Sequence, residues 1–156
     1  MKAATLYEIK QELIQLPPSK LTDICLRLAR FKKENKELIS YLLFEAGDES
    51  GYIQSVKIEM DELFETVNKS NLYLAKKTLR KILRTTGKHT RYMSSKTAET
   101  ELLIYFCQKL RAGGLPFHKN TALANLYKNQ VTKVEKLIQG LHEDLQHDFT
   151  MQLKSL

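Results

Sequence analysis

Residues 53–83 read IQSVKIEMDELFETVNKSNLYLAKKTLRKIL, and they give the clearest indication of the fold. Apolar residues recur there at steps of three and four, which is the spacing of one face of an α-helix. Before the turn these residues are Ile53, Val56, Met60, Leu63 and Val67, and after it they are Leu72, Ala75, Leu79, Ile82 and Leu83. The turn between them, Asn68–Asn71, is short, so the two helices should be antiparallel neighbours. The stretch therefore predicts a helical hairpin.

The same helical spacing continues through most of the chain. It covers four further segments, residues 6–16, 21–31, 97–111 and 123–149. Helix breakers such as Pro17-Pro18 and Gly113-Gly114 lie between these segments. The alternation of apolar and polar residues that marks a strand is found nowhere. We therefore expect an all-α fold of six or seven antiparallel helices, either a stack of helical hairpins resembling an α-α superhelix or an irregular bundle.

The chain has 156 residues, the size of one domain, and we expect residues 1–156 to form a single all-helical domain. A long C-terminal helix is predicted for residues 120–156. Without a break it would be about 50 Å long at ~1.5 Å per residue, which is longer than a domain of this size can cover. Two outcomes stay open. Either Gly140 breaks the helix, or its far half packs on another chain and makes the protein a homo-oligomer.

Three further predictions concern short segments. Leu38–Ala46 is apolar nearly all round, so we expect it to be buried on several sides. Gly87 is a good C-terminal stop for the second helix of the hairpin, and Lys88–Lys96 is polar and unpatterned, so we expect a loop there. Cys25 and Cys107 lie in helical apolar segments, where we expect two reduced thiols in the core.

The beginning of the chain carries a pattern that can be compared with known proteins. Two apolar helical stripes are separated by a breaker and followed by a polar segment: Leu6-x-x-Ile9-x-x-x-Leu13-x-x-Leu16, then Leu21-x-x-Ile24-x-x-x-Leu28-x-x-Phe31, then Asn35-Lys36-Glu37 before Tyr41-Leu42. Together with the later basic helix, this pattern resembles small bacterial all-helical families of unknown function over roughly residues 5–110. The resemblance implies a helical fold and no activity.

The positive charge of the chain is concentrated in one segment. The chain has 25 basic and 18 acidic residues, which gives a net charge of +7. Residues 66–98 contain nine Lys and Arg and no Asp or Glu, so the remaining sequence has 16 basic residues against 18 acidic ones. One helix and the segment after it therefore account for the whole excess. This concentration is the sequence feature that points to a partner.

Seven residues of this segment are the candidate binding residues: Lys77, Arg80, Lys81, Arg84, Lys88, Arg91 and Tyr92. We expect a non-catalytic interaction or scaffold module that docks an acidic surface of another protein on four of them, Arg80, Arg84, Lys88 and Arg91, whereas binding of nucleic acid would also use Lys77, Lys81 and Tyr92. The alternative is a nucleic-acid-binding protein, for RNA or single-stranded DNA. In that case the cations would contact phosphates and the ring of Tyr92 would stack on a base.

A third interpretation is that the basic helix is neutralised within the chain. Residues 45–65 carry seven acidic residues against a single Lys. Counting outward from the turn sets Glu62 level with Lys77. The same count sets Glu59 level with Arg80. Ion pairs across the hairpin would contribute only about 0–1 kcal/mol each, but they would cancel the local field that a charged partner needs.

Motifs for catalysis, metals and membranes are lacking. His142 and His147 are five residues apart, whereas the zinc-hydrolase pattern needs two His at i and i+4 on one helix face. Gly87-Lys88 lacks the further Gly and the Ser or Thr of a phosphate-binding loop. No apolar run approaches the ~20 residues that span a bilayer, and no secretory signal follows the N-terminus. We expect no catalytic site, metal or cofactor, and a cytoplasmic protein with no membrane partner.

Overall fold

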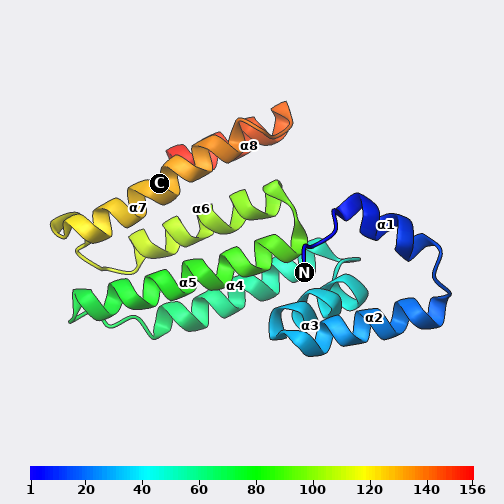
Figure 1. Cartoon of the computed structure of the whole chain (residues 1–156). Coiled ribbons are helices and arrows are strands. Elements are labelled where there is room, and N and C mark those ends of the chain that lie inside the picture. The colour runs from blue at the N-terminus through cyan, green and yellow to red at the C-terminus, as the bar shows by residue number, and fades with distance from the viewer. The chain divides into compact units, whose positions relative to one another are not determined.

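The computed structural model describes all residues from Met1 to Leu156 and is all-helical, with 80% helix and no strand (Figure 1). The all-α prediction is confirmed, although there are eight α-helices instead of six or seven. By its internal contacts the chain divides into two compact units, Met1–Glu45 and Ala46–Leu156. The expectation of a single domain over residues 1–156 stays a prediction. None of the helices combines the length and the apolar character needed to cross a membrane.

The first unit consists of short helices: α1 (Leu6–Ile14), α2 (Pro18–Phe31), α3 (Lys33–Ser40) and a five-residue π-helical turn, η1 (Tyr41–Glu45). Helix α1 begins at a capping box, in which the N–H of Glu8 donates to Thr5 Oγ1 and the N–H of Thr5 donates to Glu8 Oε2. The side-chain amide of Asn35 donates to the Leu28 carbonyl at 2.9 Å and ties α3 to α2.

This first unit buries little of its apolar surface. No residue of α1, α2 or α3 is buried. Within Leu38–Ala46, Tyr41 is buried and Leu38 and Ile39 are half-buried, but Leu42, Leu43 and Phe44 are 58%, 69% and 79% exposed, so the prediction of burial on several sides was wrong for the second half of the segment. Apolar side chains all round a segment predict burial only where neighbouring elements cover every side. Cys25 is exposed as well, so its assignment to the core was also wrong.

The second unit is larger and contains α4 (Glu49–Glu65), α5 (Leu72–Met93), α6 (Lys96–Ala112), the 3-10 turn η2 (Phe117–Lys119), α7 (Thr121–Ile138) and α8 (Glu143–Lys154). Helix α6 contacts each of the other four α-helices of the unit, and Figure 1 shows it running beside α5. Eight residues of α6 are buried: Ala98, Thr100, Leu102, Leu103, Ile104, Phe106, Cys107 and Leu110. Helix α6 is therefore the centre of the apolar core.

Helix α5 continues past Gly87, so the predicted stop there and the predicted loop at Lys88–Lys96 were wrong. The inner face of the helix is formed by Thr86 before Gly87 and by Thr90, Tyr92 and Met93 after it, all of them buried. Because Thr86 and Thr90 are not aliphatic, the sequence looks unpatterned there. The helix ends at Met93, and its C-cap residue Ser94 has a left-handed φ of 50°.

The C-terminal segment is two helices and not one. Helix α7 ends at Ile138 and α8 starts at Glu143, so the predicted long helix over residues 120–156 was wrong and the break at Gly140 is confirmed. Phe149 of α8 belongs to a buried cluster with Ile104 of α6 and Val134 of α7. Self-association through residues 120–156 stays a prediction.

The hydroxyl of Thr86 is buried and has no hydrogen-bond partner. Thr86→Val should raise the free energy of unfolding by about 1 kcal/mol, because it removes an unsatisfied buried polar group and keeps the branched shape. Urea unfolding followed by circular dichroism measures the change. Thr100→Val is the matched control, since Thr100 is also buried but its hydroxyl donates to the Lys96 carbonyl at 2.8 Å. Equal effects of the two substitutions would contradict the assignment.

Candidate functional site

The cations of α5 lie on the side of the helix that faces away from the core. They recur at steps of three and four residues along a continuous helix, opposite the fully buried Ala75, Leu79 and Ile82. We call this surface the basic face and define it as Lys77, Arg80, Lys81, Arg84, Lys88 and Arg91. Because α5 does not end at Gly87, the face extends for about 20 Å at ~1.5 Å per residue.

Part of the basic face borders a groove of about 460 Å³. All of the lining residues belong to α5: Tyr73, Lys76, Lys77, Thr78, Arg80, Lys81 and Arg84. The ring of Tyr73 is 77% exposed at one end of this group. The groove therefore combines cationic side chains with an accessible aromatic ring.

The cations around this groove are not neutralised by the acidic helix α4. Lys77, Arg80, Lys81 and Arg84 form no ion pair. The pairs across the hairpin that the sequence suggested for Glu62 and Glu59 are therefore not formed. No carboxylate of α4 is therefore within ion-pair distance of these four cations.

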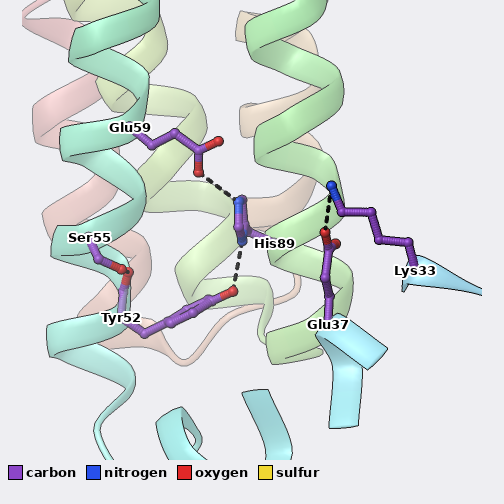
Figure 2. Close-up of polar contacts among 6 residues, drawn as sticks. All are labelled: Lys33, Glu37, Tyr52, Ser55, Glu59 and His89. Atoms are coloured by element: carbon purple, nitrogen blue, oxygen red, sulfur yellow. Dashed lines mark hydrogen bonds and ion pairs between the residues drawn. The ribbon is translucent and has the colours of Figure 1, made fainter. Parts of the chain in front are cut away.

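Glu59 contacts the ring of His89 and not the basic face. His89 Nε2 lies 3.0 Å from Glu59 Oε2, and His89 Nδ1 lies 2.7 Å from the hydroxyl of Tyr52 (Figure 2). Both ring nitrogens are thus engaged, so His89 links α4 to α5 and is not available as a base in this arrangement. The hairpin register could have identified this contact, because it places Tyr52 within about half a turn of His89.

A second acidic residue of α4, Asp61, contacts α6. Its carboxylate lies 2.8 Å from Lys109 Nζ and accepts a hydrogen bond from the hydroxyl of Tyr105. Partial burial of Asp61 opposes ionisation, but the hydrogen bonds from Lys109 and Tyr105 outweigh it and lower the pKa of the carboxyl. Lys57 and Glu101 form a second α4–α6 pair at 2.6 Å. Acidic residues of this unit thus stabilise the packing of α4 on α6.

The structure brings together only some of the predicted site residues. Arg91 is exposed and lines a separate groove of about 470 Å³ with Ser94, Lys96 and others. Lys88 is on the same side of the helix and is half-buried. Tyr92 is 9% exposed, and its ring packs edge-on against His89 at 6.1 Å, so little of the ring is accessible to a base, and its role in base stacking stays a prediction.

His142 contributes to the local fold near the C-terminus. His142 is the N-cap residue of α8, where its ring accepts from the N–H of Asp144. No group of three or more His, Cys, Asp or Glu side chains is arranged to hold a metal ion.

A comparison of the chain with protein-family models, with curated proteins and with solved structures finds no match. The resemblance of residues 5–110 to small bacterial helical families stays a prediction.

The lowered pKa of Asp61 predicts a pH dependence of stability. Its contribution to the free energy of unfolding should be complete above about pH 4, the ordinary value for Asp, and should be lost as the pH falls through the lower folded value. Urea unfolding of wild type and Asp61→Asn at several pH values measures this, and the variant should lose less stability on acidification. Glu62→Gln, at an exposed position without an ion pair, should behave as wild type. Identical pH profiles for Asp61→Asn and wild type would contradict the prediction.

The thiol of Cys107 is fully buried, and burial raises its pKa to about 12. Because the thiolate is the reactive form, Cys107 in a Cys25→Ser chain should resist an aromatic disulfide reagent at about pH 8 in the native state. It should react fully after unfolding in guanidinium. Rapid reaction of the native protein would show that Cys107 is accessible.

Proposed function

We propose that the chain is a non-catalytic interaction module whose basic face on α5 docks an acidic surface of another protein. The observation that carries this proposal is the set of four unpaired cations, Lys77, Arg80, Lys81 and Arg84, around one groove. Like charges three and four residues apart destabilise a helix by roughly 0.2–0.5 kcal/mol per pair. A bound anionic surface would remove this repulsion.

The surroundings of the groove support a protein partner. Tyr73 and Leu74 are 77% and 42% exposed at the N-terminal end of α5, so apolar and cationic side chains are neighbours. An acidic amphipathic segment would match both, with carboxylates accepting paired hydrogen bonds from Arg80 or Arg84 and apolar side chains covering Tyr73.

The alternative is binding of RNA or single-stranded DNA through the same face. The sequence favoured nucleic-acid binding through a flexible basic loop and an accessible Tyr92. Residues 88–93 are helical instead, and Tyr92 is buried. The exposed ring of Tyr73 beside the cations is the observation that still supports it, since such a ring can stack on a base.

The arrangement proposed for the second unit is a stack of helical hairpins. The contacts of α4 with α5, of α5 with α6 and of α6 with α7 support it. A cytoplasmic location is part of the same proposal.

The test is fluorescence anisotropy with a labelled polyglutamate peptide and with single-stranded RNA, each at two salt concentrations. We expect Arg80→Glu/Arg84→Glu to weaken peptide binding by about tenfold, because two charge contacts of ~0.5–1 kcal/mol each are lost. Lys128→Glu/Lys136→Glu is the matched control, because it changes two exposed cations of α7 and gives the same net charge. It should change binding less than about twofold.

Three outcomes decide against the proposal. Equal losses in the two variants would mean that only net charge matters. Tighter binding of RNA, falling steeply with salt, would favour the nucleic-acid alternative. No binding of either probe at low salt would remove the basic face as a docking site for polyanions.

A further inference from the structure

The first unit, Met1–Glu45, exposes an unusual amount of apolar side chain. Each of the following is at least 37% exposed: Leu6, Tyr7, Ile9, Ile14, Ile24, Leu26, Leu28, Phe31, Leu42, Leu43 and Phe44. The second unit is more than twice as long, yet only four large apolar residues are exposed there: Ile58, Tyr73, Leu74 and Met151. The exposed apolar surface of the chain is therefore concentrated in the first unit.

The area involved is that of an interface. If a fully exposed large apolar side chain presents about 200 Å², the eleven residues together expose on the order of 1,000 Å². A monomer's largest apolar patch is typically about 300–600 Å². A standard stable interface buries roughly 800 Å² on each partner. The unit as a whole thus exposes enough apolar surface for one such interface, whereas Ile24, Leu28 and Phe31 of α2 alone expose only about 330 Å² at the same ~200 Å² per side chain.

Three of the four exposed apolar residues of α2 form one face, and Leu26 lies on the other side of the helix. Ile24, Leu28 and Phe31 recur at steps of four and three, and they are 37%, 51% and 77% exposed. Cys25 lies beside this stripe and is exposed too. The unit as a whole has eight cations and six anions, so it is nearly neutral and gives no strong attraction for an acidic protein or an anionic membrane.

We propose that this unit is a homodimerisation element in which the apolar stripe of α2, together with exposed apolar side chains of α1 and η1, packs on the same surface of a second copy. An apolar surface of this size needs a permanent cover, because an uncovered one leads to aggregation. A second copy is synthesised with the first at the same concentration, and an uncharged stripe is complementary to itself across a two-fold axis. The proposal is independent of the basic face on α5.

Sedimentation equilibrium of the full chain is the first test. Wild type should be a dimer at about 10 μM, a concentration at which an interface of this size with a Kd near or below 1 μM is mostly filled. Leu28→Glu/Phe31→Glu should be monomeric with an unchanged far-ultraviolet circular dichroism spectrum, because both side chains are exposed. Ile58→Glu, an apolar-to-acid change at an exposed site of the second unit, is the matched control and should stay dimeric.

Crosslinking through Cys25 locates the interface without a change in α2. A bismaleimide with a spacer of about 10 Å should join two wild-type chains, since a two-fold axis near the stripe brings the two thiols close. The covalent dimer should be absent in Cys25→Ser, because Cys107 is buried. This arm decides the question even if Leu28→Glu/Phe31→Glu fails to fold.

Three results would overturn the proposal. A wild-type monomer at about 10 μM would mean that the surface is covered within the chain or by another molecule. A dimer that persists in a folded Leu28→Glu/Phe31→Glu would place the interface elsewhere. A dimer that Cys25 cannot crosslink would exclude packing of α2 on α2.

Discussion

Helix α6 is the constraint on which the second unit depends. It contacts each of the other four α-helices of Ala46–Leu156, and its apolar residues from Leu102 to Leu110 are almost entirely buried. Each neighbouring helix must therefore turn its apolar face toward this centre. For α5 the consequence is that Ala75 and Leu79 point inward and the basic face points outward. The position of the cations is thus a result of core packing.

Charged residues of α4 contact α6 and His89 and not the basic face. Asp61 binds Lys109 on α6 and Glu59 contacts His89, so these two acidic residues of α4 do not pair with the outer side of α5. The basic helix and its charge could be predicted from the sequence, but its lack of ion pairs could not. Counting from the turn sets Glu59 level with Arg80, but its carboxylate contacts His89, nine residues further along α5. The count therefore gave neither the partner of Glu59 nor the direction in which the carboxylate points.

Helices were predicted well wherever their inner face is aliphatic, and poorly where it is not. Thr86 occupies a buried position of α5, so the helix appeared to end at Gly87. The break at Gly140 was one of two outcomes because helical spacing continues through it. Conversely, the apolar Leu42–Phe44 segment is exposed. An apolar pattern shows which side chains would gain from burial, but it does not show which other part of the chain packs against them. Contacts between helices are what the sequence could not supply.

The central claim is that the outer face of α5 is open to an acidic partner. Amide ¹H–¹⁵N chemical shifts during titration with a polyglutamate peptide test it most directly, because they report the bound surface residue by residue. The account predicts that the largest shifts fall between Tyr73 and Arg91, that they diminish as salt is added, and that α7 is unaffected. Shifts centred on other helices, or none at saturating peptide, would contradict it.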